Sequence, residues 1–570
     1  MGRVRNICAR KLLGLACHLF DERVPQLDRV FPSRLNERGS QDADLRDLDD
    51  LTPATRKEES DMNLSAQHHF RTYKPAPLKP AEIDDVEILF GGLHWRAERM
   101  LQAVFENMGY KARPLPVATK DDLLTGRELA DIGQCCPTSF TTGNLANFLR
   151  RETEEIGTEA VAAKYVYMTA GSCGACRFGQ YHQSYELALR NIGLESFRMF
   201  LIDQSSPDQG AANGGGLEIN MPLTIGAVWG ILCADVLQGL EYRTRPYEVN
   251  AGQTDEVVKE CVDYLAEAFR NRPHRGRKWG TVAWHMSTNY FINALREVFA
   301  RFEAIEVDRL QVKPIVKITG EFYLQTVEGD PNYNIHRWLE AEGAEVYPAA
   351  IAVWLDYLIR VQVQQLEEYV GVEKCARAKL AALRGIQKLF GWTYNRMRAA
   401  VGNIPFEMPD QYELRKLAAP YFHHRLSGGE GDMLVGKSLW THLHRKAHMI
   451  CELSPYACMP NTMSIGAMAG VTGKYPDLLY APIEVKGDAE VHALSRCQMI
   501  LTEAKKRAIA EYVEVMEKTG LTPDEAKPLL DASPAMTRAT YRVPQTGVAA
   551  GMAANTLLHL AEQNGRRIAS

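Results

Sequence analysis

The sequence predicts an α/β protein in which two Rossmann-like blocks of parallel sheet carry helical insertions. The first observation behind this prediction is a repeated order of strand, helix and strand, in which a glycine often follows the helix. Alternation of this kind is typical of parallel sheets whose faces are covered by helices. The second observation is size, because 570 residues, 46% of them hydrophobic, are enough for several cores.

Four strand–helix units are expected along the chain, from short β-branched and aromatic runs that alternate with helical apolar spacing. The expected elements are a strand over 86–90, a helix over 95–108 and a strand over 110–115; a strand over 165–169, a helix over 177–191 and a strand over 197–202; a strand over 315–319, a helix over 334–341 and a strand over 345–347; and a strand over 449–453 with a helix after Pro460. Ligands of such folds bind at the carboxyl ends of the strands.

The same patterns divide the chain into four regions. Residues 1–80 are polar and interrupted by prolines, which predicts a partly disordered N-terminal arm. Residues 81–205 are expected to form an α/β domain that carries the cysteine turns described below. Residues 206–310 are mainly helical, and residues 311–570 are expected to form a second α/β domain with C-terminal helices.

Charge and hydropathy limit the classes of partner. Lys and Arg number 66 and Asp and Glu 71, a net charge of −5 with no long run of either sign. This balance does not favour nucleic acid, so a small molecule or another protein is expected. The apolar stretch 220–234 is too short to span a membrane and contains Pro222, so no membrane span is expected. The basic N-terminus lacks a small-residue cleavage site and predicts a surface helix instead of a signal peptide.

The cysteines indicate a metal site. There are twelve, unevenly clustered, which suits a reduced, cytoplasmic protein better than a disulfide framework. Cys173 and Cys176 stand three residues apart, where the strand over 165–169 gives way to the helix over 177–191. A helix start favours thiolate over thiol. By itself, the pair is compatible with a redox pair, half a zinc site or part of an iron–sulfur site.

Two further turns favour the iron–sulfur interpretation. Cys135 and Cys458 each precede an expected helix that has a proline near its first turn. Three such turns beside strand ends can converge on one point, as an iron–sulfur cluster requires. Zinc is the main competitor, but no histidines stand at matching short spacing. The scattered cysteines are expected to be core residues: Cys233, Cys261, Cys375 and Cys497.

Two other features are open to more than one interpretation. Glu321 follows the strand over 315–319, so it is either a general base or substrate anchor, or a helix cap. The stretch Gly431–Ser438 fits the phosphate-loop expression G-x-x-x-x-G-K-[ST], but no strand pattern precedes it. Its glycines are therefore expected to make a turn, with Lys437 near an anionic ligand.

Four motifs occur in order along the chain: Gly133-Gln-Cys-Cys-Pro-Thr-Ser-Phe-Thr-Thr-Gly-Asn-Leu145, Cys173-Gly-Ala-Cys-Arg-Phe-Gly179, Val316-Lys-Ile-Thr-Gly-Glu-Phe322 and Cys458-Met-Pro460. Together they resemble the 2-hydroxyacyl-CoA dehydratase and benzoyl-CoA reductase superfamily, specifically the carboxyl-terminal part of the large CoA-substrate-specific enzyme activases. The resemblance covers about residues 86–515 and, more weakly, 547–560.

The resemblance implies a dehydratase-like α/β fold and an oxygen-sensitive [4Fe-4S] cluster, or a double-cubane cluster. The implied ligands are Cys135, Cys176 and Cys458, with Cys173 as a candidate fourth. Low-potential electrons would come from an ATP-hydrolysing activator of actin-like fold on another chain, because residues 1–80 are too few to supply it. A homologous subunit is a further expected partner, and the substrate would be an acyl-CoA or another small molecule. Glu321 is the candidate catalytic residue.

Two roles stay open at this point. Three cysteine ligands would leave one iron free to bind a substrate carbonyl, as in dehydratase relatives, whereas four would favour electron transfer alone. The chain is therefore expected to be a dehydratase- or reductase-type component or, alternatively, a non-catalytic, cluster-bearing scaffold or electron-relay subunit. Cys136 stands where the family commonly has asparagine, and it adds an alternative ligand.

Overall fold

The computed structural model describes residues 82–131, 133–171, 175–203, 219–273, 278–426 and 428–566. The arm expected over 1–80 and the candidate ligand Cys173 lie outside the described residues. Residues 75–361 and 387–570 belong to one compact unit, and residues 362–386 belong to another. Both sheets and the described candidate site residues lie in the larger unit.

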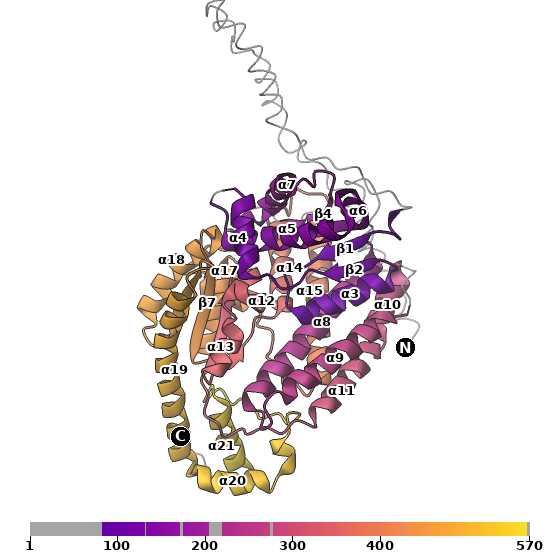
Figure 1. Cartoon of the computed structure of the whole chain (residues 1–570). Helices are drawn as coiled ribbons and strands as arrows, with labels where there is room; N and C mark the ends of the chain where they lie inside the picture. Colours follow the sequence, from indigo (N-terminus) through magenta and orange to yellow (C-terminus); the bar gives the residue numbers. More distant parts are fainter. Residues whose placement is uncertain are drawn as a thin grey trace, which may run out of the picture. The chain divides into compact units, whose positions relative to one another are not determined.

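Two parallel sheets of four strands form the framework of the larger unit (Figure 1), which confirms the predicted α/β class. Their strand orders are β2-β1-β3-β4 and β6-β5-β7-β8, and every neighbouring pair is parallel. The order is therefore the same in both sheets, although the sequence has no exact repeat. The strands are β1 (Glu87–Phe90), β2 (Lys111–Pro114), β3 (Tyr165–Gly171), β4 (Arg198–Asp203), β5 (Ile315–Gly320), β6 (Glu345–Tyr347), β7 (Met449–Pro455) and β8 (Tyr480–Val485).

Each sheet has a point at which the strand order reverses. Strand β1 lies between β2 and β3, and β5 lies between β6 and β7 in the same way. Connections that leave neighbouring strand ends in opposite directions open a crevice at the carboxyl ends, where α/β proteins bind ligands. The carboxyl ends of β3, β5 and β7 lead to Cys176, Glu321 and Cys458. The topology thus directs three candidate residues to such crevices.

Burial explains which strands the sequence predicts well. Strands β5 and β7 are buried at every position, so each is a continuous apolar-rich run. Strand β8 escapes the sequence prediction because it alternates between more and less buried positions and contains Pro482. Proline is tolerated there because β8 is an edge strand of its sheet.

Helices connect the strands, and four of them follow one another between residues 221 and 302. The expected helices over 95–108, 177–191 and 334–341 are confirmed with small shifts of their ends, the second starting as a 3-10 turn, η4 (Arg177–Gln180). The α-helices are α3 (Trp95–Asn107), α4 (Lys120–Leu129), α5 (Cys136–Ile156), α6 (Thr158–Lys164), α7 (Tyr181–Asn191), α8 (Met221–Thr244), α9 (Gln253–Arg270), α10 (Lys278–Ser287), α11 (Tyr290–Phe302), α12 (Phe322–Thr326), α13 (Ile335–Ala341), α14 (Ile351–Glu368), α15 (Ala376–Ala400), α16 (Gln411–Ala418), α17 (Asp432–Leu443), α18 (Met459–Lys474), α19 (Glu490–Thr519), α20 (Pro523–Asp531) and α21 (Met552–Gln563).

Helix α8 is more extensive than the apolar stretch in the sequence suggests. Together with the 3-10 turn that follows, residues Met221–Tyr247 form the one described helix that is long and apolar enough to cross a membrane. Core helices of soluble proteins meet the same criterion, and 72% of its most apolar window is buried. Helices α3, α9 and α10 pack against it, with α3 and α9 alongside it in Figure 1. Its apolar character is accounted for by this packing.

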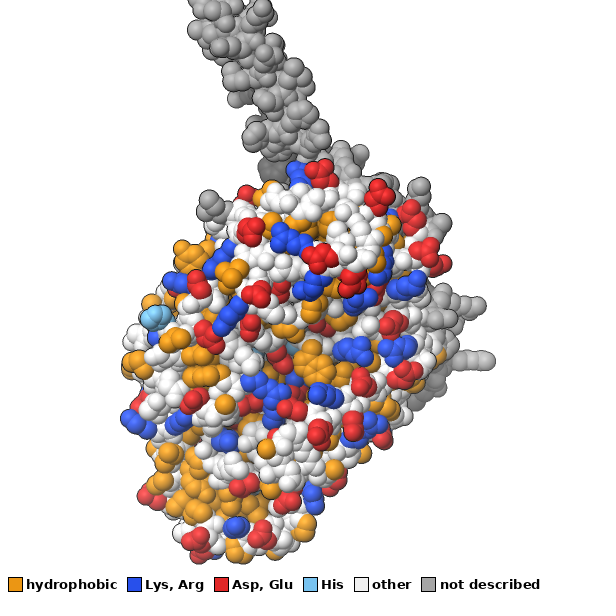
Figure 2. Space-filling model, in the orientation of Figure 1, with side chains coloured by type: hydrophobic (Ala, Val, Ile, Leu, Met, Phe, Trp, Pro, Cys, Tyr) orange, Lys and Arg blue, Asp and Glu red, His pale blue; other side chains and the backbone are white. Residues whose placement is uncertain are grey.

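The surface has no single-sign region on the face drawn in Figure 2, where Lys and Arg side chains are interspersed with Asp and Glu. This distribution matches the near balance of charges in the sequence. The described surface seen from this side therefore offers no stripe of positive charge of the kind that nucleic acids require.

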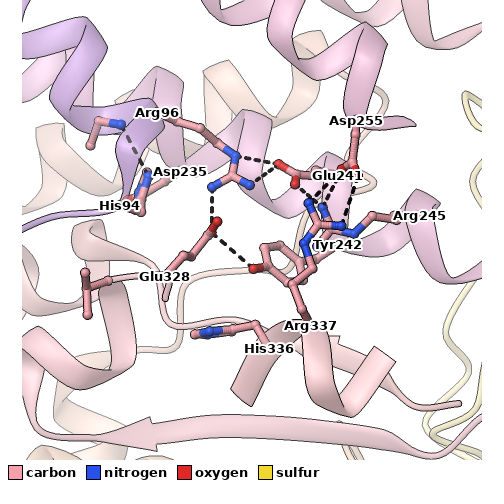
Figure 3. Close-up of polar contacts among 12 residues, drawn as sticks. His94, Arg96, Asp235, Glu241, Tyr242, Arg245, Asp255, Glu328, His336 and Arg337 are labelled. Carbon is pink, nitrogen blue, oxygen red and sulfur yellow. Dashed lines mark hydrogen bonds and ion pairs between the residues drawn. The ribbon is translucent and has the colours of Figure 1, made fainter. Parts of the chain in front are cut away.

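A buried ionic network joins the first α/β block, the helical region and the second block (Figure 3). Arg96 of α3 pairs with Glu241 of α8, and at 2.7 Å with Glu328, which follows α12. Arg245, at the end of α8, pairs with the same Glu241. It also pairs at 2.8 Å with Glu340 of α13. Three separate parts of the fold are thus connected through two arginines.

The network keeps its charges despite burial. Burial alone would raise the pKa of Glu328, but Arg96 and His336 outweigh it and lower that pKa to about 2. Burial likewise opposes the charge of Arg96, yet Glu241 and Glu328 raise its pKa above the ordinary value. Burial lowers the pKa of His336 to about 4, so this imidazole is neutral at pH 7. The Glu328 carboxylate therefore stays ionised chiefly because its arginine partner offsets the loss of solvent.

We expect Arg96→Ala to lower the free energy of unfolding by about 3–5 kcal/mol, because it leaves Glu328 without its counter-charge and Glu241 with Arg245 alone. Urea unfolding followed by circular dichroism measures the change. Arg99→Ala on the same helix is the matched control, since Arg99 is half-exposed and lies 3.5 Å from an exposed Asp263, a pair worth about 0–1 kcal/mol. Equal losses in the two variants would contradict a structural role for the network.

Candidate functional site

The three described cysteine turns share one local structure. Cys135, Cys176 and Cys458 each occupy the N-cap position, directly before α5, η4 and α18 respectively. Their backbones are extended, and the following helices of Cys135 and Cys458 carry proline in the first turn. The expectation that these cysteines stand at helix starts is confirmed. N-cap side chains project toward the positive end of the helix dipole.

One arginine connects the three turns. Arg177, the residue after Cys176, donates hydrogen bonds to the carbonyl oxygens of Gly133 and Ala457. Gly133 lies two residues before Cys135, and Ala457 directly precedes Cys458. The amide of Cys136 also donates to the carbonyl of Tyr456 at 3.4 Å. Turns that are far apart in the sequence are therefore held together through their backbones.

The thiols have few polar neighbours. The Sγ atom of Cys135 lies 2.9 Å from the Tyr181 hydroxyl and 3.1 Å from that of Thr138. The Phe178 amide donates to Cys176 Sγ at 3.5 Å, and the Cys458 thiol donates to Asn461 Oδ1 at 3.7 Å.

Burial decides the protonation of the Cys136, Cys176 and Cys458 thiols. It raises the pKa of Cys176 and of Cys136 to about 12, and it raises that of Cys458 further. The expectation that a helix start favours thiolate is thus outweighed for Cys176 and Cys458 by loss of solvent. At neutral pH both are thiols, and binding of a metal would have to release their protons.

A set of buried ionisable groups lies beside the thiols. Burial raises the pKa of Glu321 to about 7 and that of Glu430 to about 8, and the two carboxyls repel each other's charge. Burial lowers the pKa of Lys437 to about 8, although Glu430 opposes the shift. Both carboxyls act electrostatically on Cys176 and Cys458. Groups that titrate near pH 7 in a crevice are typical of functional sites.

Glu321 caps a helix. It precedes α12, and its Oε2 accepts a hydrogen bond from the Leu324 amide at 2.9 Å. The helix-cap interpretation is therefore confirmed, while a catalytic role stays a prediction. Gly320 explains how Glu321 reaches this position, because a Cβ atom there would lie 2.2 Å from the carbonyl oxygen of Leu453 on β7.

The phosphate-loop match in the sequence does not have the fold of a phosphate loop. No described strand precedes it, and Lys437 lies inside α17 instead of at its start. Gly431 is at the N-cap with a positive φ, as a turn requires, but the helix that follows it was not expected from the glycines. Gly436 lets α17 approach α16, since a Cβ atom would lie 2.4 Å from the carbonyl oxygen of Leu414.

Among the described residues, no group of three or more His, Cys, Asp or Glu side chains is placed to hold a metal ion. Ligands of a polynuclear cluster bind different irons and stand further apart than ligands of one ion. The donor types suit such a cluster. In addition, two buried polar atoms at the turns, Arg177 Nε and Gln134 Oε1, have no hydrogen-bond partner in the described parts of the chain.

Sequence reasoning missed several residues of this site. Arg177 and Tyr181 follow the Cys173–Cys176 pair, but nothing in the sequence around them predicts contacts with turns 40 or more residues away. Glu430 and Lys437 had a signal, the glycine-rich stretch, from which the sequence predicts a turn and an anionic ligand near Lys437 but no contact with the cysteines. Only the fold brings these four residues to the cysteines.

The fold and site define an α/β protein with cysteine turns at the carboxyl ends of two parallel sheets. No protein-family model matches the sequence, and a search of curated proteins finds no match. The family resemblance of the four motifs therefore stays an expectation.

Glu98 allows a test of burial at this edge of the first sheet. Its Oε1 accepts a hydrogen bond from the Leu93 amide at 3.0 Å, and burial raises its pKa to about 7. Below about pH 4.5 the carboxyl is protonated in the folded and unfolded chain alike. Between about pH 4.5 and 7 the carboxyl ionises in the unfolded chain but stays largely protonated in the folded chain, so the free energy of unfolding falls as the pH rises through this range.

We expect Glu98→Gln to reduce the fall in unfolding free energy between pH 5 and pH 8 by of the order of 3 kcal/mol. Urea unfolding at four pH values measures the slope. Glu159→Gln, at an exposed position of α6, is the control and should leave the slope unchanged. A wild-type slope in Glu98→Gln would contradict the raised pKa.

Proposed function

We propose that this chain is an iron–sulfur protein of the dehydratase or reductase type, which receives low-potential electrons from a separate ATP-hydrolysing activator. The observation that carries the proposal is the junction at Arg177, whose side chain joins the turns of Cys135 and Cys458 to its own neighbour Cys176. Three cysteines held this way at helix starts supply thiolate donors of the kind that clusters use.

Cys135, Cys176 and Cys458 would hold a [4Fe-4S] cluster, or one part of a double-cubane cluster. When bound, such a group supplies single-electron transfer at low potential. The chain's own contribution is a buried, low-dielectric setting and a cationic Arg177 beside thiolates that would otherwise repel one another. Cys136, whose side chain is also buried, adds a fourth sulfur close by.

The acid–base groups support a catalytic role over a purely relaying one. Glu321 and Glu430 can each hold a proton near pH 7, which is the range in which proton transfer by a carboxyl is efficient. Phe322, next to Glu321, and Lys437 line a pocket whose other walls include Trp354, Tyr394 and Met433. A mostly apolar pocket with a few polar groups is the usual form of a small-molecule site.

The alternative function is a non-catalytic scaffold or electron-relay subunit. A cluster ligated by Cys173 as well as Cys135, Cys176 and Cys458 would favour it, because no iron would then be free for a substrate. The pocket beside Glu321 favours the catalytic component instead.

We expect anaerobically purified protein to be brown and to contain about four irons per chain, or about eight for a double cubane. Cys135→Ala, Cys176→Ala and Cys458→Ala should each lose at least half of the iron and acid-labile sulfide. Cys261→Ala is the matched control, since Cys261 is a buried cysteine of α9 and should retain full iron. Colourless, zinc-loaded wild-type protein would sink the proposal.

The Cys173→Ser variant separates the two functions. If one iron is open and catalytic, this variant should keep its full iron content. Its electron paramagnetic resonance signal should also change when candidate substrates are added. Loss of iron equal to that of Cys176→Ala is the outcome for a closed relay cluster. Cys136→Ser, measured in parallel, tests the alternative ligand in the same way.

A further inference from the structure

A second pocket lies away from the cysteine turns and has an excess of positive charge. Its walls come from the end of α8, the loop after α11, the end of α15 with the loop that follows, and the segment before α21. Five cationic side chains line it, against the single carboxylate of Glu407. The cations are Arg243, Arg309, Arg398, Lys446 and Arg542. Glu407 is already paired with Lys446, at 2.8 Å.

Among the described residues, buried Arg309 has no carboxylate partner. Its relative exposure is 5%, and its guanidinium donates to the backbone carbonyls of Met536, Arg538 and Tyr541. Burial, together with the charge of nearby Arg243, lowers its pKa to about 10. These carbonyl contacts fix the guanidinium in place but leave its charge uncompensated.

Arg398 is in a similar position. Its Nε and Nη2 atoms donate hydrogen bonds to the carbonyl oxygens of Pro405 and Asn403, at 2.6 and 3.3 Å. Burial lowers its pKa, and Arg542 contributes in the same direction. In the described residues it forms no ion pair with a carboxylate.

Arg243 has a hydrogen-bond donor without an acceptor among the described residues. One of its NH groups binds Glu345, and its side chain is only 8% exposed. Its Nε is buried without a hydrogen-bond partner among the described residues. A buried N–H of this kind is costly unless a partner accepts from it. The side chain lines the pocket, where a bound anion would provide that acceptor.

We propose that this pocket binds a phosphate-bearing small molecule. The excess of cations calls for more than one negative charge, and a phosphate group carries about −1.5 to −2 near pH 7. Guanidinium groups match phosphate oxygens in a bidentate manner, and three of the cations are arginines held by carbonyls or a carboxylate in fixed positions. The proposal does not depend on the cysteine turns.

Aromatic rings give the pocket a wall for the organic part of such a molecule. Phe406 and Tyr347 stack with ring centroids 3.5 Å apart, and Arg243 lies over the Phe406 ring at 4.9 Å. Both rings also line the first pocket, so the stacked pair forms part of the wall of each. Tyr247 and Tyr541 add further ring surface.

Isothermal titration of the full chain with pyrophosphate tests the proposal. We expect binding that weakens at least about fivefold in Arg398→Gln and in Arg542→Gln, since each removes one charged donor. Arg496→Gln, at an exposed position of α19, is the control and should bind as the wild type does. Arg542 is exposed, so its variant decides the outcome if Arg398→Gln does not fold by circular dichroism.

Citrate provides the comparison between anion types. It should bind at least about tenfold more weakly than pyrophosphate, because its carboxylates do not present the compact charge of a diphosphate. No binding of pyrophosphate at millimolar concentration would overturn the proposal. Unchanged affinity in both pocket variants, an equal loss in Arg496→Gln, or equally tight binding of citrate would overturn it too.

Discussion

The buried pairs around Arg96 and Arg245 are the constraint on which the rest of the fold depends. The two sheets have separate cores, and α8 with its ionic partners stands between them. Apolar packing is tolerant of small shifts, whereas a guanidinium shared by two buried carboxylates permits only one arrangement. The network therefore sets the position of α3 against α8 and α13. That position in turn determines where the carboxyl ends of both sheets lie.

Sequence periodicity predicts the central strands and the glycine-closed helices. Strands β1, β3, β5 and β7, at the centres of the sheets, and helices α3 and α7 lie within a few residues of expectation. The central strands are apolar runs, whereas each of the two helices has one buried face and apolar residues at helical spacing. Strand β8 and helix α17 escape prediction for opposite reasons. Pro482 interrupts the first. The glycine-rich sequence at the start of the second is typical of a loop, and only the fold shows that Gly436 allows close contact with α16.

The candidate site also has a part that the sequence predicts and a part that only the fold determines. The sequence predicts that three cysteines stand at helix starts, since a nearby proline or strand end indicates such turns: Cys135, Cys176 and Cys458. The raised pKa values of Cys176 and Cys458 are not predictable, because they depend on how much solvent the assembled fold removes. The contribution of Glu430 is even less accessible to sequence reasoning. Its raised pKa comes from burial and from Glu321, more than one hundred residues earlier in the chain.

Arg177 has a consequence for the order in which the protein matures. Its two carbonyl acceptors belong to a turn of the first α/β block and a turn that follows β7 of the second. Neither block folded alone contains the complete junction, so the site forms only after the blocks have docked. Any cofactor delivered to these cysteines would thus be inserted late, into a finished molecule, and its uptake would report that both halves have come together.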